Sequence, residues 1–111
     1  MDTTSALRAL AALGHPLRLA TFRTLVQGPR GGLAVGELRE SLGIPGSSLT
    51  AHLHRLRAAG LVEDRREGRI VRVRARVEAM HALMDYLLEN CCAGQTACPP
   101  PNPEDRGPAC R

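Results

Sequence analysis

The feature of this sequence that most constrains its fold is a pair of short helical patterns joined by a tight turn. The first pattern has apolar residues at i, i+3 and i+7, which are Val35, Leu38 and Leu42. The second has them at i, i+4 and i+7, which are Leu49, Leu53 and Leu56. Residues 43–46 (Gly-Ile-Pro-Gly) separate the two patterns, and Gly60 ends the second. Two helices joined by a turn of about four residues that contains glycine predict a helix-turn-helix.

The segment that follows predicts a β-hairpin over residues 61–75, with its turn at residues 66–69. Apolar and basic residues alternate along its second half, where Val71, Val73 and Ala75 are interleaved with Arg72, Arg74 and Arg76. A period of two is expected of a strand with one solvent-facing side. A hairpin placed directly after a helix-turn-helix predicts a winged helix-turn-helix.

Three more helices are predicted around this unit. One ends before Gly14, and a second begins at Pro16, because the restriction that this proline places on His15 favours a break there. The second helix is apolar on two faces, so we expect it to be central and buried. The last helix, over residues 77–89, has apolar residues at helical spacing: Met80, Leu83, Met84, Leu87 and Leu88. The expected fold class is mainly α, with four helices, a two-stranded hairpin and a fifth helix in that order.

Composition changes near residue 90. The remaining residues are rich in cysteine, glycine and proline, and three consecutive prolines at 99–101 favour an extended segment. We therefore expect a winged helix-turn-helix domain over residues 1–90 and a flexible tail over residues 91–111. A domain this small buries only about 60–70% of its unfolded surface, and oligomerisation is a common remedy.

The sequence also predicts a compartment. No apolar run approaches the ~20 residues needed to cross a bilayer, and the opening Met-Asp-Thr-Thr lacks the basic and apolar regions of a secretory signal. We expect a cytoplasmic protein with no membrane partner. Thiols stay reduced in the cytoplasm. Its 4 cysteines are therefore expected to be ligands or reactive groups before disulfides.

The basic residues predict a nucleic-acid partner. The formal net charge is +4, and all 15 basic residues are arginine, whose planar fork can contact phosphates and guanine edges through two hydrogen bonds. The helix over residues 47–59 presents small and hydroxyl-bearing residues opposite its leucines, and the hairpin adds arginines beside it. The candidate contacts to double-stranded operator DNA are Ser47, Ser48, Thr50, Ala51, His54, Arg55, Arg66, Arg69 and Arg72. The alternative interpretation is a solvated helix face beside a charged edge strand that resists aggregation.

Three stretches resemble a known family. They are residues 13–19 (Leu-Gly-His-Pro-Leu-Arg-Leu), residues 38–42, and residues 49–62, which contain the run His-Leu-His-Arg-Leu-Arg-Ala-Ala-Gly-Leu-Val. Over roughly residues 5–90 the chain is similar to the ArsR/SmtB family of metal-sensing winged-helix repressors. The resemblance implies a homodimer formed through the first and last helices, and release from operator DNA when a metal binds.

The chain departs from that family at three places. Arsenic sensors carry cysteines early in the third helix, whereas residues 33–38 (Leu-Ala-Val-Gly-Glu-Leu) have none. Gly46 and Ala51 stand where longer polar side chains often contact bases. Zinc sensors place paired ligands on the last helix, and His81 and Asp85 do not have the matching spacing.

All four cysteines fall in the last part of the chain, at Cys91, Cys92, Cys98 and Cys110. Adjacent Cα atoms are about 3.8 Å apart, which is too close for an ordinary disulfide, so Cys91 and Cys92 are better suited to bind one soft ion together. Cys98 is close enough in sequence to supply a third thiolate. Three thiolates suit As(III) or Sb(III), and the arrangement resembles arsenic sensors whose site lies at the end of the last helix. We expect one of these ions as inducer and no organic cofactor.

Other roles for the cysteines remain open. Zn(II) or Cd(II) would need a fourth ligand, from Cys110 or a histidine, to complete a tetrahedron. A redox switch could pair Cys98 or Cys110 with Cys91 or Cys92, and the tail cysteines could be inert. The role of Cys110 stays undetermined.

Two functions of other classes are less consistent with the sequence. A phosphatase-like or arsenate reductase enzyme with a Cys-x5-Arg phosphate cradle would need an arginine six residues after a cysteine, and the sequence has none; we expect no enzyme. A winged-helix module that binds only proteins is disfavoured by the arginines of the hairpin, and a salt-dependent mobility shift would distinguish it.

Overall fold

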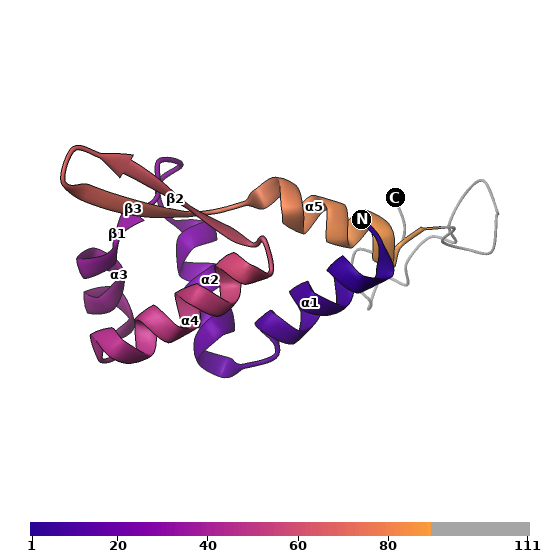
Figure 1. Cartoon of the computed structure of the whole chain (residues 1–111), viewed down its shortest axis with the longest axis horizontal. Coiled ribbons are helices and arrows are strands. Elements are labelled where there is room, and N and C mark those ends of the chain that lie inside the picture. The colour runs from indigo at the N-terminus through magenta and orange to yellow at the C-terminus, as the bar shows by residue number, and fades with distance from the viewer. Residues whose placement is uncertain (90–111) are drawn as a thin grey trace, which may run out of the picture.

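The computed structural model describes residues 1–89 and consists of helices around one small antiparallel sheet (Figure 1). The elements are α1 (Thr3–Leu13), α2 (Pro16–Gln27), β1 (Leu33–Ala34), α3 (Val35–Leu42), α4 (Gly46–Ala58), β2 (Val62–Glu67), β3 (Ile70–Ala75) and α5 (Val77–Leu87). The helix-turn-helix is formed by α3 and α4, and β2 and β3 form the hairpin, which we call the wing. The predicted mainly helical winged helix-turn-helix is confirmed.

The local sequence explains where the helices begin and end. Pro16 is the first residue of α2, and the Nδ1 atom of His15 accepts a hydrogen bond from the Leu17 N–H, which caps the helix. At the end of α3, Gly43 adopts a left-handed conformation with φ 65°, and its N–H donates to the Arg39 carbonyl. This glycine turn directs the chain into α4, which begins at Gly46, one residue earlier than predicted.

The turn at the tip of the wing is shorter than the predicted residues 66–69, and the paired strands are correspondingly longer. Strands β2 and β3 pair from Val62 opposite Ala75 to Glu67 opposite Ile70, so only Gly68 and Arg69 remain in the turn. Gly68 has a φ of 61°, as tight two-residue hairpins require.

The sheet contains a third strand, β1, that the sequence does not predict. The two residues of β1 pair with β3, with Leu33 opposite Val73 and Ala34 opposite Arg72, so the sheet has the order β1-β3-β2 instead of two strands alone. Two residues are too few to show a period, and they lie between two glycines and a helix. Pairing with β3 therefore defines this strand, and no local pattern predicts it.

One core joins all these elements. Leu38 of α3 and three leucines of α4 are completely or almost completely buried, together with Phe22 and Leu25 of α2. Val73 and Ala75 of β3 and Leu83 of α5 close the core from the sheet and the last helix. In this arrangement the leucine face of α4 is covered and its opposite face is left to solvent.

Helix α2 is central, but the prediction that it is buried on two faces is wrong. Only its Thr21, Phe22 and Leu25 side is buried, whereas Leu19 and Val26 are 44% and 47% exposed in the single chain. The neighbours of α2 are α1, α3, α4 and β3. They cover one side of the helix, which leaves the second apolar side uncovered within residues 1–89.

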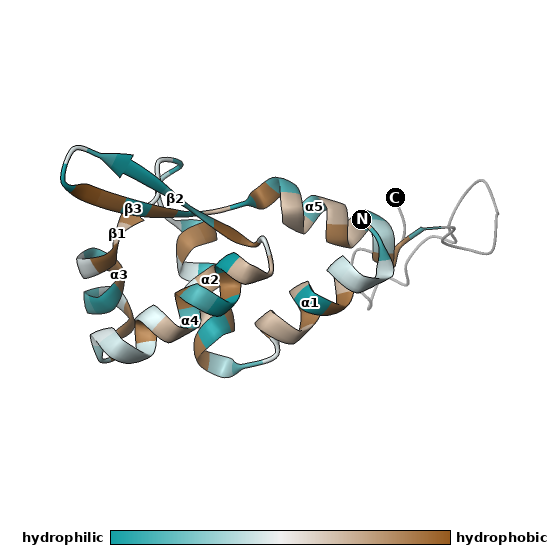
Figure 2. Cartoon of the chain, in the orientation of Figure 1, coloured by the Kyte–Doolittle hydropathy of each residue, from teal (hydrophilic) through white to brown (hydrophobic). Residues whose placement is uncertain are grey.

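Helices α1 and α5 form the end of the molecule opposite the wing (Figure 1). The hydroxyl groups of Thr3 in α1 and Tyr86 in α5 form a hydrogen bond that joins the start of one helix to the end of the other. Hydrophobic residues recur along both helices in Figure 2, and several large ones are exposed: Leu7, Leu10, Met84, Leu87 and Leu88. Within residues 1–89, no helix combines the length and apolar character needed to cross a membrane.

The short strand β1 depends on a close approach of two backbones. Gly32 has a φ of 89°, and a Cβ atom placed there would lie 2.4 Å from the carbonyl oxygen of Val73. Only glycine can adopt this conformation and leave room for the neighbouring strand. The adjacent Gly31 has nothing within 4 Å of the equivalent position.

We expect Gly32→Ala to lower the free energy of unfolding by at least about 2 kcal/mol, because it combines backbone strain with a clash against β3. Gly31→Ala, the matched control, should change it by less than about 0.5 kcal/mol. Urea unfolding followed by circular dichroism measures both values. Equal stabilities of the two variants would contradict the proposed packing of β1 on β3.

Candidate nucleic-acid interface

The exposed side of α4 gathers most of the residues predicted to contact DNA. Ser47, Thr50, Ala51, His54 and Arg55 are exposed, and Ser48 is half-buried. They lie opposite the buried leucines, so the sequence pattern placed this face correctly. The residues are small near the start of the helix, where a nucleic acid could approach the backbone closely.

The first turn of α4 offers backbone donors. The first helical hydrogen bond into this turn is donated by Leu49 to the Pro45 carbonyl, and Pro45 has no side chain that could cap the helix. The N–H groups of Gly46, Ser47 and Ser48 precede that bond and point out of the helix end, an arrangement that favours anions. The Thr50 hydroxyl donates to the Gly46 carbonyl at 2.9 Å and retains its capacity to accept.

The arginines of β3 and Arg76, which directly follows it, do not form the free basic stripe that their alternation suggested. Arg72 lies 3.5 Å from Glu37 of α3 and 3.4 Å from Glu67 of β2. Arg74 contacts Glu63 and, at 3.1 Å, Glu78 of α5, and Arg76 lies 3.9 Å from the same two carboxylates. These ion pairs tie the sheet to α3 and α5, so Arg72 is engaged within the protein although the sequence analysis assigned it to DNA.

The electrostatics of this network are consistent with its geometry. The hydrogen bond to Glu63 raises the pKa of Arg74, and the carboxylates of Glu63 and Glu78 act in the same direction. The pKa of Glu78 is lowered first by its own backbone N–H and then by Arg74. Exposed ion pairs contribute about 0–1 kcal/mol each, so the network orients elements more than it stabilises them.

A second group of arginines makes no ion pair with any of residues 1–89. Three of its members are at the wing tip and one is on the exposed side of α4; the group consists of Arg8, Arg18, Arg23, Arg30, Arg39, Arg55, Arg65, Arg66 and Arg69. The predicted contacts Arg55, Arg66 and Arg69 belong to this group. Their charges are therefore available to an anionic partner.

A salt bridge joins the wing to α4. The Arg57 Nε atom lies 2.9 Å from the Asp64 carboxylate of β2, and both side chains are partly exposed. Arg55 and Arg57 thus have different surroundings although they are two residues apart. The sequence does not separate them, because Asp64 meets Arg57 only after the chain has turned at Gly60.

The structure also pairs two histidines that the sequence analysis did not connect. The rings of His15, at the start of α2, and His52, on α4, have centroids 4.9 Å apart. The buried Nδ1 atom of His52 has no hydrogen-bond partner among the described residues. Burial lowers the pKa of His52, and the charges of His15 and Arg18 lower it further. Thirty-seven positions separate the two histidines, so no local spacing could have indicated this pair.

The metal-site predictions fall largely beyond this region. Cys91, Cys92 and Cys98 lie outside the described residues, as does Cys110. Within residues 1–89, no group of three or more histidine, cysteine, aspartate or glutamate side chains could hold a metal ion. His81 and Asp85 are both exposed on α5.

Comparison with known proteins agrees with the helix-turn-helix fold. The sequence profile of a helix-turn-helix domain family matches residues 13–65. The chain is 37% identical over 84 residues to the biofilm growth-associated repressor of Agrobacterium fabrum, and this region covers 76% of the chain and 69% of that protein.

Solved structures show the same arrangement of elements. An ArsR-like transcriptional regulator from Rhodococcus sp. RHA1 superimposes with a TM-score of 0.70 at 26% identity, covering 82% of each chain. The homodimeric winged helix-turn-helix DNA-binding domain of a possible ArsR-family regulator from Mycobacterium bovis gives a TM-score of 0.62 at 26% identity, covering 86% of this chain and 89% of that one.

The half-buried His52 makes stability depend on pH. Because the pKa of His52 is lower in the folded than in the unfolded chain, the unfolded chain binds more protons between the two values. The free energy of unfolding should therefore decrease as the pH falls below about 6.5, the ordinary histidine value, and level off below the folded-state pKa. We expect His52→Gln to flatten this dependence in urea unfolding between pH 7.5 and 5.

His54→Gln is the matched control, since His54 is exposed two residues away on the same helix. It should keep the dependence of the unmodified chain. If His52→Gln loses as much stability as the unmodified chain on acidification, the acid sensitivity comes from another group.

Proposed function

Because this chain belongs to the ArsR/SmtB family of winged-helix transcriptional regulators, we propose that it is a dimeric repressor that binds operator DNA through α4 and the wing. The observation that carries the proposal is the exposed side of α4, where backbone donors, small polar side chains and Arg55 lie opposite a fully buried leucine face. Members of this family act by regulating transcription and are not enzymes.

The arginines supply the electrostatic part of this binding. Arg65, Arg66 and Arg69 at the wing tip make no ion pair within the described part of the chain, so they can neutralise phosphates or enter the minor groove. Arg55 can contact a phosphate or a guanine edge beside α4. Arg57 and Arg72 are instead paired with carboxylates within the protein.

A dimer is supported by the apolar end of the molecule. Leu7 and Leu10 of α1, Met84 and Leu87 of α5, and Leu88 directly after α5 are exposed on the single chain. Contiguous exposed apolar residues commonly mark an interface. The similar domain from Mycobacterium bovis is a homodimer. Two copies joined here would present two recognition helices about one DNA turn, ~34–36 Å, apart.

For the inducer, we propose As(III) or Sb(III) bound by Cys91, Cys92 and Cys98. The support comes from sequence: two adjacent cysteines and a third nearby follow α5, and soft thiolates select soft ions. Cys91 stands four positions after Leu87, the last residue of α5. Since the Tyr86 hydroxyl is bonded to α1, a ligand that shifts the end of α5 would also act on the dimer surface and so on the spacing of the recognition helices.

Two other inducers could act through the same cysteines. Zn(II) or Cd(II) would need a fourth ligand such as Cys110, and oxidation would form a disulfide among the same cysteines. A coupling free energy of about 1–3 kcal/mol lowers operator affinity roughly 5–150-fold, whichever inducer acts. By linkage, operator DNA weakens inducer binding by the same factor.

We expect Arg55→Gln to weaken operator binding by about 1–3 kcal/mol, or roughly 5–150-fold, because it removes a charged contact from the exposed side of α4. Arg57→Gln, on the same helix but paired with Asp64, should change affinity less than about threefold. Fluorescence anisotropy with an operator duplex at several salt concentrations measures both. Equal losses for the two variants would count against this assignment of the DNA-contacting face.

The inducer site is tested by operator release under reducing conditions. Arsenite should release the unmodified protein, whereas Cys91→Ser, Cys92→Ser and Cys98→Ser should bind DNA normally and lose arsenite release. Cys110→Ser is the matched control and should still respond. Normal release by all three variants would refute the thiolate site, and release by zinc, cadmium or an oxidant instead of arsenite would identify one of the other inducers.

A further inference from the structure

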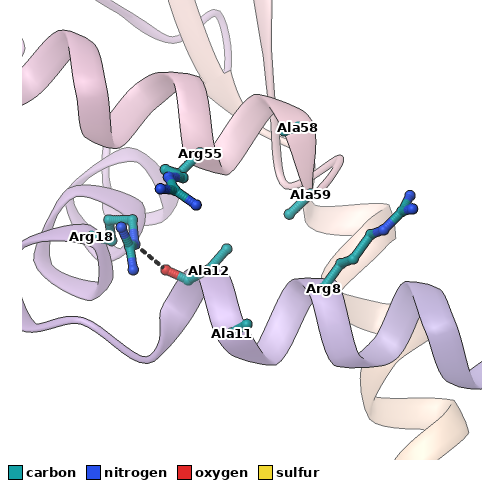
Figure 3. Close-up of a pocket in the computed structure, with 7 residues that line it drawn as sticks. All are labelled: Arg8, Ala11, Ala12, Arg18, Arg55, Ala58 and Ala59. Atoms are coloured by element: carbon teal, nitrogen blue, oxygen red, sulfur yellow. Dashed lines mark hydrogen bonds between the residues drawn. The ribbon is translucent and has the colours of Figure 1, made fainter.

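A pocket of about 420 Å³ lies where α1, α2 and α4 meet (Figure 3). Arginines from all three helices line it: Arg8 from α1, Arg18 from α2 and Arg55 from α4. Between them the wall consists of alanines, among them Ala11 on α1 and Ala58 at the end of α4. The pocket therefore combines an apolar wall with positive charge.

The charge of this pocket is not neutralised by the described part of the chain. None of the three arginines forms an ion pair with any of residues 1–89, and no acidic side chain is among the pocket's lining residues. In Figure 3, Arg18 and Arg55 lie on one side of the space between α1 and α4, and Arg8 rises from α1 on the other.

One of these guanidinium groups is held in place. The Nε atom of Arg18 donates a 2.7 Å hydrogen bond to the Ala12 carbonyl, drawn as a dashed line in Figure 3. This bond uses one of the five guanidinium N–H donors and leaves the terminal nitrogens for a ligand. A pre-oriented arginine loses less rotational freedom when it binds an anion.

The positive charge of Arg18 also acts on a neighbouring histidine. His52 is on α4 beside His15, and the charges of His15 and Arg18 help to lower its pKa. The three arginines share the pocket, and no carboxylate is among its lining residues. Clustered like charges favour binding of an anion that offsets their repulsion.

We propose that this pocket binds a small organic anion, a carboxylate- or phosphate-bearing molecule with a short apolar body. Guanidinium groups contact carboxylates and phosphates through paired, charge-assisted hydrogen bonds, and the alanines accommodate the apolar part. The volume lies within the roughly 300–1,000 Å³ of small-molecule sites. The acceptor groups on the ligand, and not its exact skeleton, determine recognition.

The position of the pocket gives the ligand a regulatory effect, and this part rests on the proposed DNA-binding function. Arg55 lines the pocket and also borders the exposed side of α4. An anion that engages Arg55 withdraws its charge from DNA and ties α4 to α1, so anion and operator compete. Binding of the anion to the free protein does not depend on that function.

The test uses the reduced full chain and two probes, citrate and inorganic phosphate, at constant ionic strength. Amide chemical shifts of 15N-labelled protein are followed in the titration. Citrate should shift the amides of Ala11, Ala12, Ala58 and Ala59 in a saturable way. Arg18→Gln and Arg55→Gln should each weaken citrate binding about tenfold, the effect of removing one charge-assisted contact.

Two further variants distinguish specific binding of the anion in the pocket from its nonspecific attraction to positive charge. Arg23→Gln removes an exposed arginine of α2 that does not line the pocket and should leave citrate affinity within about twofold of the original. Ala11→Leu keeps every charge but fills the pocket, so it should weaken citrate binding more than phosphate binding. Arg55 is exposed, so its variant keeps the fold even where Arg18→Gln, which loses the bond to Ala12, unfolds.

Equal weakening by Arg23→Gln and by the pocket variants would overturn the proposal, since it would show attraction to net charge alone. The proposal would also fail if an operator duplex shifted the pocket amides while neither citrate nor phosphate did, because the arginines would then serve the DNA backbone. In an anisotropy experiment at fixed ionic strength, citrate should weaken operator binding by the unmodified chain more than by Arg18→Gln. Failure to bind any DNA would refute the proposed function and leave the amide titration as an independent result.

Discussion

The arrangement of this molecule depends on the burial of one side of α4. Leu49, Leu53 and Leu56 are 0%, 1% and 0% exposed, and they pack with residues from α2, α3 and the sheet. Complete burial of a leucine side chain contributes about 1.5–3 kcal/mol, so these three side chains fix the rotation of the helix about its axis. That rotation directs Ser47, Ala51 and the other small residues to solvent. The candidate DNA-binding face is thus a consequence of core packing on the opposite side of the same helix.

The arginines divide into two groups with different physical roles. Those of β3, together with Arg57, lie opposite carboxylates and join the sheet to α3, α4 and α5. Those of α1, of the exposed part of α4 and of the wing tip make no such pair within residues 1–89. The protein uses one residue type for both purposes, and only the position of the acidic side chains decides which purpose each arginine serves. Basic composition predicts a nucleic-acid partner, but it cannot identify the contacts.

This division explains how far the sequence could predict the structure. The repeats of α3, α4 and α5 are local, so the helix-turn-helix and the exposed residues of α4 followed from spacing alone, and the alternation in β3 identified the wing. The ion pair between Arg72 and Glu37 depends on the pairing of β1 with β3, which brings the start of α3 beside the sheet. The His15–His52 contact and the arginine pocket likewise join residues from different helices. Such features require the tertiary structure, and the period of a single segment does not reveal them. The cysteine site, which lies outside residues 1–89, stays a prediction.

Helix α1 connects the proposed sites and buries less apolar side-chain surface in the core than α4 does. Its buried residues are Ala6, Ala9 and Ala12, whereas α4 contributes three leucines. Each alanine buries three fewer carbon atoms than a leucine, at about 0.8 kcal/mol per methylene group, so a displacement of α1 sacrifices much less packing than a displacement of α4. One end of α1 is bonded to α5 through Thr3 and Tyr86, and its other half lines the arginine pocket. If the chain acts as proposed, a ligand at either site acts on a helix whose displacement sacrifices less packing than that of α4, and α4 keeps its orientation within each subunit. The proposed effect of the inducer is then a change in how two intact recognition helices are placed relative to each other, because the core that shapes each of them stays closed.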